Sequence, residues 1–197
     1  MNEYQELIKS MKIKSKKELP SNQGKYLNKK VYQVTLNNGK TFIYEQITKN
    51  NCQGNAVVII PELSNNKFLM ILETRPNTLE EVVLEYPAGM IDEGEQAPDA
   101  AKRELLEETG YIAQNFELLE WHYQDQGCSQ ARIYTYLATN LKKVSNNYGV
   151  DDDENIRPIT VTLEETSNLI ATEKIVDANS KIAYLTLKLK KRGNNYE

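Results

Sequence analysis

YPAGMIDEGEQAPDAAKRELLEETGY, residues 86–111, is the stretch that decides the fold of this chain. Its charged side chains are seven carboxylates and only two basic groups, namely Asp92, Glu93, Glu95, Asp99, Glu104, Glu107 and Glu108 against Lys102 and Arg103. Like charges at helical spacing repel one another by a few tenths of a kcal/mol per pair. The segment is therefore either a well-solvated acidic surface or a place where a cation binds.

The same stretch carries the signals of a helix. Pro98 suits the first turn, where its missing N–H costs nothing, and Gly110 suits the C-terminal cap. We expect one side of this helix to be apolar, with Ala97, Ala100, Ala101, Leu105 and Leu106. Glu104, Glu107 and Glu108 stand at i, i+3 and i+4 and share one face. Converging carboxylates without His or Cys are the ligands that a hard ion such as Mg²⁺ prefers.

The rest of the chain predicts strands and helices in irregular alternation, which indicates a mixed sheet with helices packed on it. Asn37-Asn38-Gly39 predicts the turn of a hairpin over residues 25–47. Further strands are expected at 56–63, 67–75, 80–89, 115–124, 130–139 and 156–163, with Pro87 and Gly89 ending the third of them. Helices are expected at 1–17, 163–172 and 177–191, and a polar loop at 140–155.

Composition excludes several classes of protein. The 197 residues, 40% hydrophobic and 26% charged, suit a single globular domain. Residues 1–40 have a charge balance of +6 and the remainder −10, and an acidic main body argues against a duplex DNA binder. We expect the basic segment to be a solvated face.

No apolar run is long enough to span a bilayer. Residues 1–20 do not resemble a secretory signal, and Cys52 and Cys128 suit free thiols in a reducing cytoplasm.

One pattern links the acidic helix to a known family. Residues from Gly89 to Tyr111 satisfy G-x5-E-x7-R-E-U-x-E-E-x-G-U, where U is apolar. This pattern is the Nudix box, and the chain resembles a Nudix hydrolase. The resemblance implies an α+β Nudix fold, a mixed β-sheet sandwiched between helices, with the N-terminal antiparallel hairpin as an extension. We expect residues 1–50 to form a helix and hairpin segment used for dimerisation, and residues 51–197 to form the hydrolase domain.

EYPAG, residues 85–89, resembles the entry to the box in ADP-ribose and ADP-sugar pyrophosphatases. By this resemblance the metal ligands are the Ala88 carbonyl, Glu104, Glu108 and Glu154, with Arg103 holding the glutamates in place. Basic side chains on the diphosphate are Lys49 and Arg75. Tyr26 and Tyr44 stand where relatives stack the adenine, although both also suit an ordinary strand. The loop at Gly127 shapes the pocket around the terminal sugar.

Three carboxylates compete for the role of general base: Asp152 and Glu154 in the acidic loop, and Glu107 in the box. The alternative is that residues 150–155 form a merely solvated acidic loop. The chain departs from the pyrophosphatase pattern at Asp125-Gln126-Gly127, where relatives have proline before glycine, and at Ala131, where many have glutamate. His122, the only histidine, suits a structural role.

The expected activity is Mg²⁺-dependent hydrolysis of a nucleoside diphosphate sugar, foremost of ADP-ribose to AMP and ribose 5-phosphate, with Mn²⁺ as an alternative ion. Other candidate substrates are GDP-mannose, further nucleotide sugars and oxidised nucleotides. A non-catalytic nucleotide sensor on the same fold is the alternative from another class. We expect a cytoplasmic homodimer, joined through the N-terminal strands, that binds neither nucleic acid nor membrane.

Overall fold

A computed structural model describes residues 2–17, 26–49, 54–63, 66–146 and 155–193. In chain order its elements are α1 (Asn2–Met11), β1 (Leu27–Thr35), β2 (Thr41–Lys49), β3 (Ala56–Pro61), β4 (Lys67–Thr74), β5 (Val82–Glu85), β6 (Ala88–Met90), α2 (Ala97–Thr109), β7 (Tyr111–Tyr123), β8 (Arg132–Lys143), β9 (Ile156–Thr162), α3 (Leu163–Ala171) and α4 (Ala178–Gly193). None of the described helices is long and apolar enough to cross a membrane.

Within the described residues the strands form a hairpin and two larger sheets. β1 pairs with β2, the four-stranded sheet has the order β6-β3-β8-β7, and the three-stranded sheet has the order β5-β4-β9. β3 and β8 are parallel, whereas β3 and β6, and β7 and β8, are antiparallel. The mixed sheet and the α+β class expected from the sequence are therefore confirmed, as is the antiparallel hairpin.

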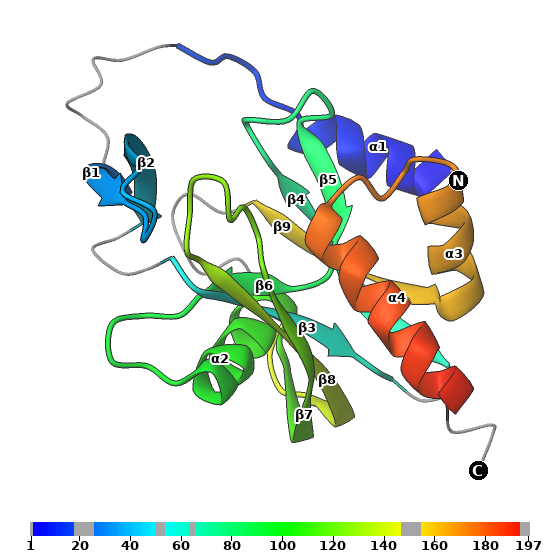
Figure 1. The fold of residues 1–197 in the computed structure, drawn as a ribbon. Helices are drawn as coiled ribbons and strands as arrows, with labels where there is room; N and C mark the ends of the chain where they lie inside the picture. Colours follow the sequence, from blue (N-terminus) through cyan, green and yellow to red (C-terminus); the bar gives the residue numbers. More distant parts are fainter. Residues whose placement is uncertain (1, 18–25, 50–53, 64–65, 147–154, 194–197) are drawn as a thin grey trace.

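Helices cover both sides of the four-stranded sheet (Figure 1). On one side, Val57 and Ile59 of β3 pack against the buried alanines and Leu105 of α2. On the other side, Val58 and Ile60 belong to the larger core, which α4 and the three-stranded sheet complete. Strand β3 thus alternates between two cores because its neighbouring side chains point to opposite faces.

The chain around Pro87 differs from the expected single strand. β5 ends at Glu85 in the three-stranded sheet, and the chain then joins the other sheet as β6, with Val58 opposite Ala88 and Ala56 opposite Met90. Proline cannot donate to a strand ladder, and its carbonyl instead accepts from Ile59 N–H at 2.8 Å. The Pro87 break therefore moves the chain from one sheet to the other and delivers Ala88 and Gly89 beside α2.

Other boundaries also differ from expectation. Residues 140–143, expected in a loop, extend β8 and pair with the start of β7. Helix α1 ends at Met11 rather than at residue 17, and Met11 is buried against the larger core. Leu106, expected on the apolar side of α2, is 37% exposed, because it lies at the edge of the apolar stripe of the helix and faces the sheet only in part.

The hairpin lies apart from the two larger sheets, at one side of the molecule (Figure 1). It contacts the loop between β7 and β8: Ile47 N–H donates to the Cys128 carbonyl at 2.8 Å, and the Tyr44 hydroxyl donates to the Gly127 carbonyl at 2.8 Å. Leu27, Val31, Ile43 and Ile47 share one face of the hairpin by their register, and each is more than 40% exposed. On this face the apolar side chains alternate with charged ones, among them the ion pair of Lys29 and Glu45, and the described chain leaves the four apolar side chains open to solvent.

Candidate active site

A cavity of about 390 Å³ lies beside β6, within the range of about 300–1,000 Å³ that is usual for small-molecule sites. Its wall combines the end of β2, the segment after β4, strands β5 and β6, and the start of α4. The wall includes polar side chains or backbone groups of Lys49, Arg75, Glu85, Ala88, Gly89 and Asn179. Segments far apart in the sequence thus meet around one short strand.

The glutamates of α2 meet this wall at β6. Glu108 is only 1% exposed and Glu104 only 7%, although carboxylates are rarely so buried. The Ala88 N–H donates to Oε2 of Glu108 at 2.9 Å. A Cβ on Gly89 would come within 2.0 Å of the Glu104 carboxyl group, so only glycine permits this approach. The acidic face predicted at i, i+3 and i+4 therefore packs against the cavity wall.

Arg103 organises the remaining carboxylates of the segment. Its Nε and Nη2 donate to the two oxygens of Glu95 at 3.0 and 2.9 Å. Nη1 donates to Glu104 at 2.7 Å and to Glu107 at 3.0 Å, and Nη2 also reaches the Met90 carbonyl at 2.9 Å. The hydrogen bonds with Glu95, reinforced by Glu104 and Glu107, raise the pKa of Arg103, while the same contact lowers the pKa of Glu95. One guanidinium thus offsets part of the acidic charge.

The donor set suits a hard divalent ion. Glu104, Glu108 and the main chain at Ala88 offer oxygen alone, the ligand type that Mg²⁺ and Mn²⁺ take in proteins. Within the described ranges, no three His, Cys, Asp or Glu side chains are gathered closely enough to hold an ion by themselves. Asp152 and Glu154, expected as base and further ligand, lie outside the described residues. The described residues therefore offer part of an oxygen donor set that suits such an ion.

Arg75, expected to bind the diphosphate, is bonded to two buried glutamates. Its side chain bonds to Glu85 at 2.6 and 2.9 Å and to Glu73 at 2.8 Å, and both glutamates are 6% exposed. Burial raises the pKa of Glu85, and Arg75 offsets this only in part. Burial alone would lower the pKa of Arg75, but Glu85 and Glu73 raise it, and Glu108 adds to their effect. The Nudix-box carboxylates and this cluster therefore share one electrostatic environment.

The residues predicted to bind substrate divide into two groups. Lys49, Arg75 and the Ala88 backbone line the cavity. Tyr44 and Gly127 lie instead at the contact between hairpin and loop, where the tyrosine ring is 42% exposed and stands edge-on to Phe42 with centroids 6.3 Å apart. Tyr26, at 52% exposure, precedes β1 on the same hairpin. The two tyrosines are thus outside the cavity wall of this chain.

Sequence reasoning missed several residues in the wall and next to it. It assigns Glu85 only to a motif and gives no role to Glu73, which pairs with Arg75, although a carboxylate within an otherwise apolar strand signals a buried polar role. Asp177 and Asn179, at the start of α4, also line the cavity. Their sequence context is an ordinary helix start, and nothing in it indicates that the fold brings them to the site.

Comparison with known proteins identifies the family of this chain. The family model of the NUDIX domain matches residues 53–182. The chain is 30% identical to the ADP-ribose pyrophosphatase of Bacillus subtilis, over 85% of this chain and 88% of that protein. It is 34% identical to the methanol dehydrogenase activator of Bacillus methanolicus, over 84% of this chain and 87% of that protein.

A solved structure supports the fold. The crystal structure of an ADP compounds hydrolase superposes with a TM-score of 0.75, covers 87% of this chain and 90% of its own, and is 23% identical. The Nudix fold expected from the sequence is thereby confirmed. The box residues packed against β6, the domain match and the identity over most of the chain together show that this chain belongs to the Nudix hydrolase family.

Proposed function

We propose that this protein hydrolyses nucleoside diphosphate sugars in a Mg²⁺-dependent reaction, and that ADP-ribose is its main substrate. The observation that carries the proposal is the pair of buried carboxylates, Glu104 and Glu108, held against Ala88 and Gly89 at the edge of a cavity. Lys49 and Arg75 in the same wall suit the negative charge of a diphosphate. The similarity to an ADP-ribose pyrophosphatase over most of the chain supports the choice of substrate.

In the proposed reaction a water oxygen attacks one phosphorus of ADP-ribose and the bridging P–O bond breaks. The products are AMP and ribose 5-phosphate, and the proton of the water passes to a carboxylate. Asp152, Glu154 and Glu107 are the candidate bases. Glu107 accepts a hydrogen bond from Nη1 of Arg103 at 3.0 Å, which occupies one of its oxygens.

We assign the remaining roles from the same geometry. Ala88, Glu104, Glu108 and Glu154 would hold a divalent ion, Mg²⁺ or Mn²⁺, which when bound neutralises charge on the diphosphate. Arg103 orients Glu104, while Lys49 and Arg75 bind the diphosphate. Tyr26 and Tyr44 stack the nucleobase, and the loop at Gly127 contacts the substrate from the hairpin side. Because both tyrosines lie outside the cavity wall of their own chain, we assign them to the neighbouring subunit's site in a homodimer.

The proposed assembly follows from the hairpin. Four apolar side chains on one of its faces, Leu27, Val31, Ile43 and Ile47, are exposed in the single chain, and a lone two-stranded hairpin is marginal without a surface to cover. We therefore propose that residues 1–50 act as the dimerisation segment of a cytoplasmic homodimer, and residues 51–197 as the catalytic domain. GDP-mannose, other nucleotide sugars and oxidised nucleotides remain alternative substrates of the same site.

A second candidate function is activation of a dehydrogenase. It is favoured by the 34% identity to a methanol dehydrogenase activator, which exceeds the 30% identity to the pyrophosphatase. This role would make the chain an interaction module, with or without hydrolysis. Adding the wild type and Glu108→Gln separately to a methanol dehydrogenase discriminates the two cases: activation by both proteins points to binding alone.

A hydrolysis panel tests the main proposal. ADP-ribose, ADP-glucose, GDP-mannose, NADH, diadenosine polyphosphates and 8-oxo-dGTP are each assayed with Mg²⁺ and with Mn²⁺. We expect fastest turnover of ADP-ribose and a loss of about 10³-fold or more in Glu108→Gln, since ion-assisted charge stabilisation is worth several kcal/mol and each factor of ten in rate is about 1.4 kcal/mol. Turnover of 8-oxo-dGTP alone would refute the sugar assignment.

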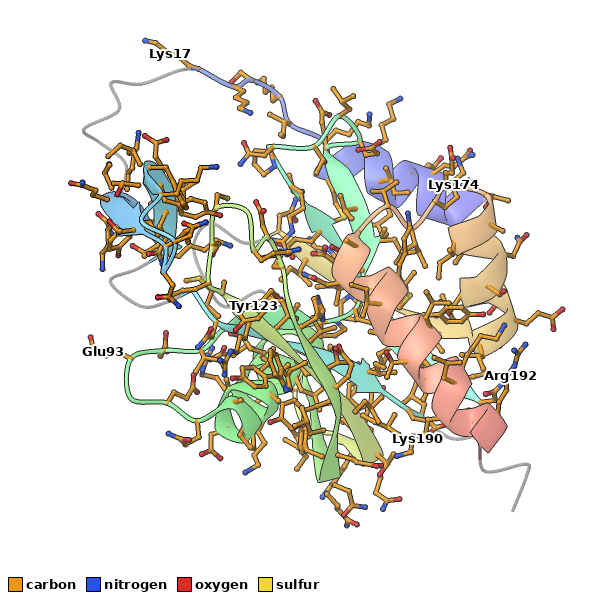
Figure 2. The ribbon with its side chains drawn as sticks, in the orientation of Figure 1. Lys17, Glu93, Tyr123, Lys174, Lys190 and Arg192 are labelled. Atoms are coloured by element: carbon orange, nitrogen blue, oxygen red, sulfur yellow. The ribbon has the colours of Figure 1, made fainter. Side chains whose placement is uncertain are left out.

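A matched control exists in the same segment. Glu93 is exposed, and Figure 2 shows it at the outer end of the loop before α2. Glu93→Gln removes one carboxylate of the acidic run without touching the buried pair, so its activity should equal that of the wild type. An equal loss in both variants would mean that the acidic run acts through its total charge rather than through Glu108.

A further inference from the structure

A β-bulge in β7 decides which side chains face the cavity. Leu118 lies opposite Tyr136, but Glu120 lies opposite Thr135, so Leu119 is an extra residue in β7. Such a residue shifts every following side chain to the other face of the sheet. Before the bulge, the even-numbered residue Phe116 packs toward α2. After the bulge, the even-numbered residues of β7 lie on the opposite face, which they share with Thr135 and Ile133 of β8. Ile133 belongs to the larger core and to the cavity wall.

The residues turned by the bulge form a polar network that reaches α4. Glu120 accepts a hydrogen bond from the Thr135 hydroxyl and lies 3.2 Å from Nδ1 of His122. Nε2 of His122 lies 3.3 Å from Oδ1 of Asn179, in the first turn of α4. A carboxylate and an amide oxygen both accept, so the ring faces acceptors through both nitrogens. A ring protonated at Nε2 donates to Oδ1, which leaves the amide NH₂ of Asn179 for another partner.

The start of α4 is fixed on a second side. Ser180 N–H donates to Asp177 Oδ2 at 2.6 Å, a helix-capping contact. The Ser180 hydroxyl, fully buried, accepts from the N–H of Tyr86 at 2.8 Å, directly before the Pro87–Ala88 turn into β6. Asn179 is thus held between β7 and the segment that carries the metal-site backbone, and it lines the cavity with Asp177 and Gln124.

We infer that Asn179 binds a hydroxyl group on the part of the substrate beyond the diphosphate, and that His122 is its positioning residue. The inference rests on the proposed hydrolysis of a nucleoside diphosphate sugar. Gln124, Asp177 and Asn179 line the cavity with two amides and a carboxylate, groups that suit sugar hydroxyls. The tyrosines assigned to the nucleobase lie outside this wall, which leaves these polar groups for the sugar beyond the diphosphate.

Two ligands that differ only beyond the diphosphate test the inference. ADP ends at its second phosphate, whereas a methylene-bridged, non-hydrolysable ADP-ribose carries the additional sugar. Titration calorimetry on the full-length protein with Mg²⁺ should show that Asn179→Ala weakens binding of the ADP-ribose analogue about tenfold and that of ADP less than twofold. With hydrolysable ADP-ribose, the same variant should raise KM more than it lowers kcat.

The positioning role of His122 has its own test. His122→Ala should weaken binding of the ADP-ribose analogue about fivefold in the wild-type background and have no further effect when combined with Asn179→Ala. His122→Gln, which can still donate to Oδ1, should recover most of the loss. Additive losses in the double variant would show that His122 does not act through Asn179, because a general loss of structure does not depend on Asn179.

The outcomes separate this inference from the proposed function. If the wild type hydrolyses no nucleotide sugar, the proposed function fails, while calorimetry still compares ADP with the analogue. If Asn179→Ala changes binding of both ligands equally, or of neither, Asn179 does not contact the distal group and the inference is wrong. Asn168→Ala, on the exposed side of α3, serves as the control and should leave both affinities unchanged.

Discussion

The main-chain N–H of Ala88 donates to Oε2 of Glu108 at 2.9 Å, which joins a three-residue strand to the acidic face of α2. The carboxylate is 1% exposed, so this bond supplies part of the solvation that water would otherwise give it. Next to it, Gly89 leaves room for Glu104. The geometry of both glutamates therefore depends on the backbone at residues 88–89, and that backbone depends on the break at Pro87.

Gly89→Ala tests this dependence directly. A Cβ at this position would lie 2.0 Å from the carboxyl group of Glu104, so the strand or the glutamate must move. We expect a loss of stability of about 1–3 kcal/mol, as for other overpacked sites, and a loss of most activity. Thermal unfolding and kcat/KM measure the two effects. Gly127→Ala is the control for stability alone, since its nearest neighbour would lie at 3.4 Å. An equal loss of stability in both variants would contradict the steric argument.

Arg103→Lys should reduce kcat/KM about 10–100-fold, the usual range when a group that orients metal ligands is lost. Lysine keeps the charge but cannot bond simultaneously to Glu95, Glu104 and Glu107 through a planar fork. The Mg²⁺ concentration for half-maximal activity should rise in parallel. Lys102→Ala, which removes only an exposed pair with Asp99, should behave as the wild type. Full activity of Arg103→Lys would show that charge alone suffices.

The acidic site could be predicted because its elements are local. Helix caps, the i, i+3, i+4 glutamates and Arg103 all fall within one short segment, and helical geometry alone places the three glutamates on one face. The wall of the cavity depends instead on tertiary pairing. Glu73 and Glu85 meet Arg75 only because β4 pairs with β5.

The position of His122 was also beyond prediction from sequence. Strand alternation alone, counted from Phe116, would place it on the face toward α2, and the bulge at Leu119 reverses that. No residue type in the β7 sequence marks a bulge. Its partner Asn179 comes from a helix far along the chain, so the two residues meet only in the folded protein.

The contact between Glu95 and Arg103 predicts a pH dependence of stability. Hydrogen bonding to Arg103 lowers the pKa of Glu95 below its ordinary value of 4.5. Between the folded-state pKa of Glu95 and its unfolded-state pKa, the unfolded protein therefore binds more protons than the folded one. The stabilisation from the contact is present above pH 4.5 and is lost as the pH falls through the folded-state pKa. Glu95→Gln should cost about 1 kcal/mol or less near neutral pH, as for other partly solvated ion pairs.

Denaturant unfolding of the wild type and of Glu95→Gln at a series of pH values measures this effect. The two stabilities should converge below the folded-state pKa of Glu95. A difference that stays constant down to acid pH would mean that Glu95 acts through packing. Glu93→Gln again serves as the control, because Glu93 is an exposed neighbour in the same loop.

The exposed hairpin face predicts the quaternary state. Val31 and Ile43 lie on the same face, 58% and 65% exposed, with Leu27 and Ile47 beside them. Covering these apolar side chains is worth about 25 cal/mol per Å² of apolar area, and replacing two of them by lysine removes that gain. Val31→Lys combined with Ile43→Lys should therefore convert a dimer to a monomer in light scattering without unfolding the chain.

The same pair of substitutions tests whether the dimer matters for catalysis. Tyr26 and Tyr44 belong to the hairpin but do not line the cavity of their own chain, so a monomer should lose nucleobase contacts and show a raised KM for ADP-ribose. Leu79→Lys changes an isolated apolar side chain, 98% exposed and outside the hairpin, and should alter neither mass nor KM. A wild type that is already monomeric and fully active would contradict the assignment, since each chain would then have to hold the nucleobase without its neighbour.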